Sequence, residues 1–310
     1  MKRRTYRAFL SFAIAVVLLS AGLALWFGLA RYRSTPQSDD IPAVGFESAE
    51  ELHSNDSQLI VHFFDVGEAD SSLVECNGHY MLIDGGNPRS SSFLYAYLQQ
   101  HNIDYLDYIV CSHPHTDHVG GLAGALNYAT VGVAYAPIIE YDSRAFNSFI
   151  KYLDRQSKTI TVPKAGDTIR LGDADVIFIA PLGENFTGKN LNNASIILKI
   201  VFGDTSFLFT GDAEVEEETS VTDSGVDIRS TLLKVGHHGS NTSSSVEFLE
   251  KVKPDYAVIS VGKDNEYGHP HSDAMERLLA VHAEIFRTDL NGEITCVSDG
   301  SSLAITSERH

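Results

Sequence analysis

The sequence has few cysteines and no repeated segment. Its three cysteines, Cys76, Cys111 and Cys296, are an odd number, and no two of them are separated by only two residues. Neither a disulfide framework nor a cysteine-based zinc site is therefore indicated. No segment recurs at a fixed period, so the chain does not have the pattern of a repeat protein.

The sequence also lacks a run of basic residues beyond its first 34 positions. Residues 1–34 hold six of the 23 lysines and arginines and none of the 41 acidic residues, so the remainder carries 17 − 41 = −24. This balance argues against nucleic-acid binding through a broad basic face, although metal ions could supply positive charge at a local site. The scattered basic candidates are Arg144, Lys189, Lys199, Arg229, Lys263 and Arg287.

The N-terminus contains a long uncharged segment. Four basic residues precede a 23-residue stretch from Ala8 to Ala30 that has no charge, which is long enough to span a bilayer as a helix. We expect residues 1–30 to be a single-pass anchor with a cytoplasmic N-terminus and residues 31–57 to be a polar tether. Residues 58–310 would then lie outside the cytoplasm. The alternative is a signal that is cleaved to release a secreted protein; no cysteine follows the span, so a lipoprotein is not indicated.

Residues 58–310 contain short apolar runs in two series, with helical patterns between them. This order predicts an α/β (α+β) fold of two packed sheets with helices outside. The expected strands are 59–64, 71–75, 80–83, 105–111, 131–136, 176–179, 195–202, 205–210, 231–235, 256–261, 294–297 and 303–306. The expected helices are 93–101, 119–126, 145–156, 246–252 and 273–281.

One segment gathers several metal-binding side chains. His113, His115, Asp117 and His118 lie within six residues, directly after the apolar run 108–110. Imidazole nitrogens mixed with a carboxylate suit divalent ions such as Zn²⁺, Mn²⁺ or Fe²⁺. A polar turn with helix-capping residues is the alternative, but three histidines and an aspartate rarely cluster by chance. The segment therefore predicts a metal site.

Other polar clusters follow other apolar runs. Asp84, Asp212, the pair His237–His238 and the segment 269–271 each come soon after an expected strand or turn. Each cluster alone could be ordinary turn chemistry. Together they predict one site built from several strand ends.

These segments resemble those of the metallo-β-lactamase fold hydrolases. The closer similarity is to the extracellular hydrolase domain of ComEC-type competence proteins and their stand-alone relatives. It covers residues 59 to 307 and is carried by the His cluster and by segments 62–71, 192–195, 209–212, 233–240 and 267–270. The first segment departs from the usual pattern, because Glu68-Ala69 replaces Gln-Gly. The resemblance implies a four-layered αββα sandwich and a metal-dependent hydrolase.

The resemblance also implies two divalent metal ions, Zn²⁺ or Mn²⁺. His113 and His115 would hold the first ion, and Asp117 and His118 the second. Asp212 would lie between the two ions as a shared ligand.

The remaining ligand positions are less regular. His237 would complete the second ion's ligands, with His238 as the alternative. Asp84 would orient a ligating imidazole through a hydrogen bond. The usual third histidine of the first ion is missing, and Asn192 or Asn193 occupies its place. An amide oxygen is a harder ligand, which favours Mn²⁺ or weaker binding there.

The resemblance also implies catalytic roles. Asp117 or Asp212 could orient the nucleophile, while His238 or His269 could protonate or polarise the leaving group.

Two residues near the pair His237–His238 have less defined roles. Ser240 could contact a phosphate. Lys234 is expected to face away from the site if Leu233 and Val235 point into the sheet core.

The substrate is the least determined feature. Phosphodiester cleavage by an extracellular DNase linked to DNA uptake or DNA breakdown is the first hypothesis. The second is hydrolysis of a small ester, thioester, lactone or nucleotide, which the acidic charge would suit. The third is a non-catalytic partner of a DNA-uptake channel, against which the complete set of ligand types argues. Because the chain has one expected span, any uptake pore would be a separate protein.

Overall fold

The computed structural model describes residues 57–182 and 190–309, which fall in one compact unit, residues 54–310. The expected anchor, residues 1–30, and nearly all of the expected tether, residues 31–57, lie outside the described residues. Among the described helices, none is both long enough and apolar enough to cross a membrane.

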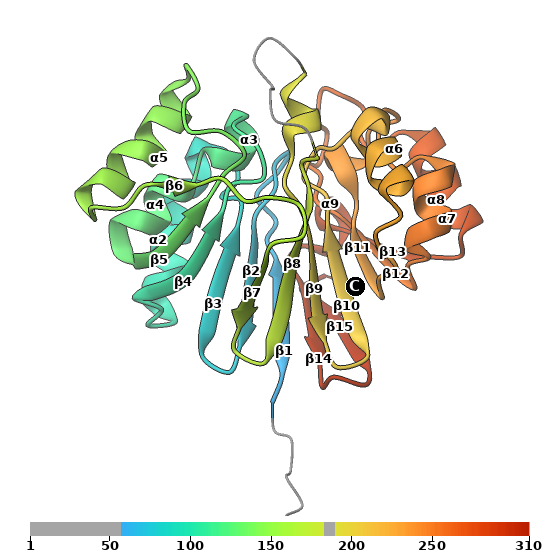
Figure 1. The fold of residues 1–310 in the computed structure, drawn as a ribbon, viewed down its shortest axis with the longest axis horizontal. Coiled ribbons are helices and arrows are strands. Elements are labelled where there is room, and N and C mark those ends of the chain that lie inside the picture. Colours follow the sequence, from blue (N-terminus) through green and yellow to red (C-terminus); the bar gives the residue numbers. More distant parts are fainter. Residues whose placement is uncertain (1–56, 183–189, 310) are drawn as a thin grey trace, which may run out of the picture. The chain divides into compact units, whose positions relative to one another are not determined.

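The first sheet is mixed, and among the described residues it has eight strands in the order β15-β14-β1-β2-β3-β4-β5-β6 (Figure 1). Strands β3, β4 and β5 run parallel to one another, so their carboxyl ends reach the same edge of the sheet. The strands are β1 (Leu59–Phe63), β2 (Ser72–Cys76), β3 (His79–Ile83), β4 (Tyr105–Val110), β5 (Thr130–Tyr135), β6 (Ile160–Thr161), β14 (Ile294–Ser298) and β15 (Leu303–Ser307).

The second sheet is also mixed, with seven described strands in the order β13-β12-β11-β10-β9-β8-β7. Strands β10 to β13 are parallel, whereas β9 and β10 form the expected hairpin through Gly203 and Asp204. The strands are β7 (Thr168–Leu171), β8 (Ala174–Ala180), β9 (Ile197–Phe202), β10 (Thr205–Phe209), β11 (Leu232–Lys234), β12 (Tyr256–Ile259) and β13 (Glu284–Arg287).

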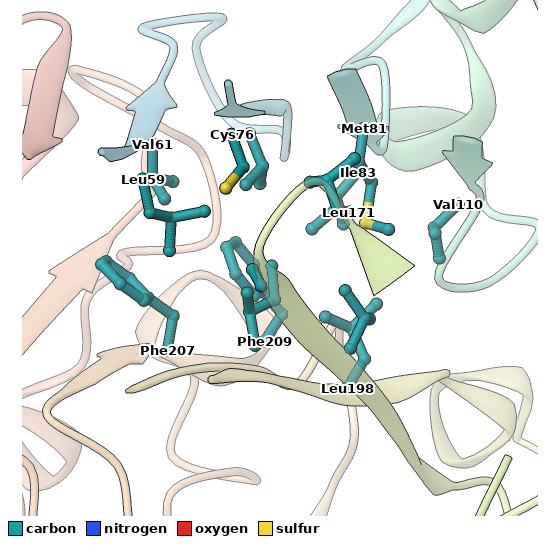
Figure 2. Packing of buried hydrophobic residues seen from close by; sticks show 14 of the residues in the cluster. Leu59, Val61, Cys76, Met81, Ile83, Val110, Leu171, Leu198, Phe207 and Phe209 are labelled. Carbon is teal, nitrogen blue, oxygen red and sulfur yellow. The ribbon is translucent and has the colours of Figure 1, made fainter. Parts of the chain in front are cut away.

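The two sheets pack face to face through a core of apolar side chains. Leu59 and Val61 of β1 lie opposite Phe207 and Phe209 of β10, and Leu198 of β9 belongs to the same cluster (Figure 2). These side chains alternate along each strand with residues that face the helices, as the two-residue period of a strand requires. Burial of each large side chain contributes about 1.5–3 kcal/mol.

Helices cover the outer face of each sheet (Figure 1). Helix α5 shows why: Phe146, Phe149 and Leu153 recur at helical spacing and are buried, and Ser143 caps its first turn through the Phe146 amide. The first sheet is covered by α2 (Ser91–Gln100), α4 (Leu122–Tyr128) and α5 (Arg144–Arg155), and the second by α6 (Val215–Ser224), α7 (Val246–Val252) and α8 (Ser272–Ala280). The remaining helical turns are α3 (Thr116–Val119), α9 (Thr288–Asn291), η1 (Pro88–Ser90), η2 (Leu191–Ala194) and η3 (Gly236–Gly239).

The predicted αββα sandwich is therefore confirmed. Helix α6 and strands β6, β7 and β13 were not expected; β6 has only two residues, and β7 and β13 have four each. Strands this short carry little periodicity, and they are defined by their neighbours in the sheet rather than by their own sequence.

Candidate metal centre

The histidine cluster follows β4 at the carboxyl edge of the first sheet. His115 is extended and lies directly before α3, a single helical turn that carries Asp117 and His118. The side chains of His113 and His118 are fully buried, whereas that of Asp117 is 36% exposed. The loop therefore presents imidazoles from the protein interior and a carboxylate from the solvent side.

Four of the predicted residues converge on one point. Ligand atoms of Asp117, His118, Asp212 and His238 all lie within 4.8 Å of one another. His118 Nε2 is 3.2 Å from Asp212 Oδ1, and His238 Nε2 is 3.2 Å from Asp117 Oδ2. Asp212 and His238 come from the second sheet, after β10 and β11, so the site lies where the carboxyl ends of parallel strands from both sheets meet.

The donor atoms of this group fit a divalent cation. His118 Nδ1 faces Asp84 Oδ2 at 2.9 Å, and His238 Nδ1 faces the carbonyl oxygen of Ser260 at 3.0 Å. Because both partners accept hydrogen bonds, each imidazole carries its proton on Nδ1 and directs Nε2 at the group. His118 Nε2 and Asp212 Oδ1 are buried without a hydrogen-bond partner in the described structure. Such atoms are expected to meet a cation.

Charge at the group also favours a cation. Burial lowers the pKa of His118, but the carboxylates of Asp212 and Asp84 raise it well above the usual value. The pKa of His238 is raised in the same way by Asp212 and Asp70. Burial would raise the pKa of Asp117, yet His118 and the hydrogen bond from His238 lower it to about 2. The surroundings thus favour positive charge at the imidazole nitrogens, which a divalent ion supplies.

A second set of donors lies beside the first. His113 Nε2 is 3.0 Å from His115 Nδ1 and 3.6 Å from Asp212 Oδ2. Burial and the neighbouring His118 lower the pKa of His113, so its ring is neutral and can ligate. Asp212 thereby faces both sets, one with each carboxylate oxygen.

The two asparagines differ in what their side chains contact. Asn192 is buried, its Nδ2 donates to Glu214, and its Oδ1 has no hydrogen-bond partner among the described residues. Asn193 accepts from the Glu214 amide through Oδ1 and donates to Glu216 through Nδ2. The free amide oxygen therefore favours Asn192 over Asn193 as the candidate ligand.

An unusual turn determines which residue of the pair His237–His238 faces the group of four. Both residues have left-handed backbone angles, with φ of 49° and 53°, a conformation that costs about 1–3 kcal/mol each. This turn directs His238 into the group of four, while His237 Nδ1 lies 3.2 Å from Thr242 Oγ1 and 3.3 Å from Glu214 Oε1. His237 Nε2 is 3.8 Å from Asp212 Oδ2. The geometry favours the alternative ligand, His238, over His237.

Asp84 lies against the imidazole of His118. Besides His118, its carboxylate accepts hydrogen bonds from the Ser112 amide at 2.7 Å and the Ser112 hydroxyl at 2.6 Å. These bonds fix the carboxylate that holds His118 Nδ1, which matches the predicted orienting role.

The expectation for Lys234 was wrong. Its side chain is 2% exposed, and its Nζ lies 2.8 Å from Asp70 Oδ2. Leu233 and Val235 face the helices outside the second sheet, so Lys234 points to the opposite side, between the sheets. The sequence analysis assigned no role to Asp70, although it lies in a segment that carries the resemblance.

His269 and Ser240 have clear partners. His269 Nδ1 lies 2.7 Å from Glu68 Oε1, and Glu68 Oε2 accepts from the Gly262 amide. Glu68, where the sequence departs from the usual pattern, thus orients His269. The Ser240 amide donates to the His237 carbonyl, and its hydroxyl bonds to Thr242. Because both groups have internal partners, the geometry argues against the predicted phosphate contact.

Comparisons with known proteins show the family to which the chain belongs. The profile of the metallo-beta-lactamase superfamily matches residues 64–263. ComE operon protein 3 of Bacillus subtilis is 29% identical over 252 residues, which are 76% of this chain and 32% of that protein. Competence protein ComA of Neisseria gonorrhoeae is 31% identical over 254 residues, 81% of this chain and 34% of that protein. The chain thus spans about a third of the length of these curated relatives.

Solved structures show the same fold at low sequence identity. The metallo-beta-lactamase fold protein YhfI from Bacillus subtilis superposes with a TM-score of 0.51 at 12% identity, covering 78% of this chain and all of YhfI. CmlA, a diiron beta-hydroxylase from Streptomyces venezuelae, gives a TM-score of 0.52 at 18% identity, covering 76% of this chain and 53% of CmlA. The resemblance found in the sequence is confirmed, and the chain belongs to the metallo-beta-lactamase superfamily of metal-dependent hydrolases.

Proposed function

We propose that this chain is a membrane-anchored, extracytoplasmic phosphodiesterase that uses two divalent metal ions and cleaves DNA. The convergence of Asp117, His118, Asp212 and His238 carries the hydrolase part of this proposal. The DNA part is supported by relatives that are named as competence proteins. The uncharged stretch from Ala8 to Ala30 supports the anchor.

The chain offers ligands for both proposed ions. Asp117, His118 and His238 would hold one ion, and His113 and His115 the other. Asp212 would contact both, because its Oδ1 faces His118 and its Oδ2 faces His113. Asn192, whose buried Oδ1 has no hydrogen-bond partner among the described residues, is the further candidate beside His113.

The chemistry divides between the ions and the side chains. When bound, two divalent ions stabilise negative charge on the attacking and leaving oxygens of a displacement reaction. Asp117 is partly exposed, so its carboxylate can accept a hydrogen bond from the attacking water and orient it. When its ring is protonated on both nitrogens, His269 can donate the Nε2 proton to the leaving oxygen, and the Glu68 carboxylate at Nδ1 stabilises that charged form. His238 is less suited to that role, because its Nδ1 contacts Ser260 and its Nε2 lies among the ligands.

Aromatic contact can compensate for the scarcity of positive charge. Tyr267 is 62% exposed and stacks on His269, with ring centroids 5.6 Å apart and planes at 18°. One face of the ring is thus fixed beside the site and the other is accessible. Stacking of a nucleobase on such a ring contributes about 1–3 kcal/mol and requires no basic groove.

Hydrolysis of a small ester, thioester, lactone or nucleotide is the second candidate. The charge of −24 beyond residue 34 favours it, since a small substrate needs no extended contact with the acidic surface. A purely binding role, as a partner of a separate DNA-uptake channel, would not require the complete set of ligands.

The test is cleavage of end-labelled single- and double-stranded DNA by the purified full-length chain with Mn²⁺. We compare Asp212→Ala with Asp204→Ala, a control at the exposed turn of the same hairpin. Cleavage that is lost only in Asp212→Ala supports the proposal. No cleavage by a chain shown to bind metal would contradict the DNase function and lead to a screen of esters, lactones and nucleotides. A chain that binds no metal would support the binding role.

A further inference from the structure

A buried ion pair lies beside the metal centre and has no role in the chemistry described so far. Lys234 and Asp70 are 2% and 4% exposed, and Nζ is 2.8 Å from Oδ2. Lys234 Nζ also donates to the carbonyl oxygen of Val235 at 2.9 Å. The lysine therefore has two fixed acceptors inside the protein.

The ion pair joins the two sheets. Asp70 precedes β2 in the first sheet, and Lys234 is the last residue of β11 in the second sheet. Their ion pair therefore crosses the space between the sheets at the edge where the ligands meet.

Asp70 contacts residues that carry or adjoin the ligands. Its amide donates to the carbonyl oxygen of Asp117 at 3.1 Å, and its carbonyl oxygen accepts from the Gly86 amide at 2.6 Å. Its Oδ1 lies 3.3 Å from His238 Nδ1 and has no hydrogen-bond partner among the described residues. Two ligands, Asp117 and His238, are thus in contact with one buried residue.

Stability alone is a weak explanation for this pair. The desolvation of two buried charges offsets most of their attraction, and apolar residues of similar size often stabilise a protein as well or better. A carboxylate beside a ligating imidazole, in contrast, fixes the ring and raises its basicity. The position of Asp70 Oδ1 next to His238 fits this second role.

We propose that Asp70 and Lys234 are positioning residues that hold His238 and Asp117 in the arrangement that binds the divalent ion. Lys234 fixes the Asp70 carboxylate. Asp70 in turn holds the His238 ring through the attraction between its Oδ1 and Nδ1, and the backbone of Asp117 through its amide hydrogen bond. The inference rests on the proposed metal centre and is independent of the substrate.

The test is Zn²⁺ binding by the full-length chain, measured by competition with a chromophoric chelator. The ion held by His238 is identified as the one whose binding is lost in His238→Ala. We expect Asp70→Asn and Lys234→Met each to weaken this binding about 10- to 100-fold, as loss of a group that supports a ligand does. Lys199→Met is the matched control, since Lys199 is a second buried lysine of the same sheet and pairs with Asp227 instead.

The double variant Asp70→Asn/Lys234→Met separates positioning from simple stability. Without an unpaired buried charge, it should recover thermal stability in EDTA relative to the single variants, whereas its Zn²⁺ affinity should stay low. Wild-type affinity in the single variants, or affinity that recovers together with stability, would overturn the proposal. If a single variant does not fold, the Zn²⁺ affinity of the double variant decides between the outcomes. Failure of the DNase function would leave this test unaffected, because no substrate is used.

Discussion

The two sheets build their halves of the metal centre in different ways. The first sheet presents His113, His115, Asp117 and His118 from one loop and one helical turn, so their spacing is local. The second sheet presents Asp212 and His238 from the ends of two separate strands. Their positions depend on the pairing of β10 with β11 and on how the two sheets pack. One half is therefore defined by a short segment, and the other by tertiary structure.

The largest effect should come from removal of the second sheet's histidine ligand. We expect His238→Ala to lose one ion and to lower kcat by more than the roughly 100-fold that loss of a supporting residue causes. His237→Ala should stay within that range, because His237 contacts Thr242 and Glu214. Elemental analysis and kcat for both variants check this. Loss of the ion in His237→Ala alone would reverse the assignment.

Weaker packing between the two sheets should disturb the positions of Asp212 and His238 more than those of the ligands in the histidine loop. Phe207 is fully buried between the sheets, and Phe207→Ala should lower the free energy of unfolding by about 3–5 kcal/mol. Urea denaturation in EDTA measures this, with the more exposed Phe93→Ala as control. A change below 1 kcal/mol would mean that the core tolerates a cavity here and that the sheets are not held as described.

The local half can be weakened without disturbing the interface. Asp84→Asn removes the charge that holds His118 Nδ1, so metal affinity or activity should fall about 10- to 100-fold. The Zn²⁺ affinity of this variant, measured beside its urea midpoint, separates orientation from stability. Unchanged affinity would show that the loop alone fixes His118.

The smallest effect should come from the exposed ring of Tyr267, which stacks on His269. Tyr267→Ala should raise KM for single-stranded DNA by about 10-fold, near the lower end of the contribution of one stacked base. Tyr267→Phe keeps the ring and should behave as wild type. An oligonucleotide without bases should be insensitive to both changes, and equal sensitivity would exclude base stacking.

The ligands that the first sheet supplies could be predicted almost completely from the sequence. The four ligands of the first sheet lie within six residues after an apolar strand, so neither long-range packing nor side-chain direction had to be known. The sandwich itself followed from two series of apolar runs. Short edge strands such as β6 could not be expected, because two residues show no period.

The ligands that the second sheet supplies could be predicted from the sequence only in part. The choice between His237 and His238 depends on two left-handed backbone positions, which no side-chain pattern reveals. Strand alternation places Lys234 on the side opposite Leu233 and Val235, but which of these sides faces the other sheet depends on tertiary packing, so the direction of Lys234 could not be predicted. Asp70 was missed because its partners are distant in sequence.

Because the C-terminal strands β14 and β15 belong to the first sheet, the strands of this sheet can pair only in a certain order during synthesis. Strand β1 pairs with β2 on one side and with β14 on the other, where Leu59 lies opposite Ser298. During synthesis, one edge of β1 therefore stays unpaired until residues 294–298 have emerged. An open strand edge invites pairing with other chains. The first sheet is thus complete only once residues 294–298 are present, and a chain interrupted earlier exposes an unpaired strand edge.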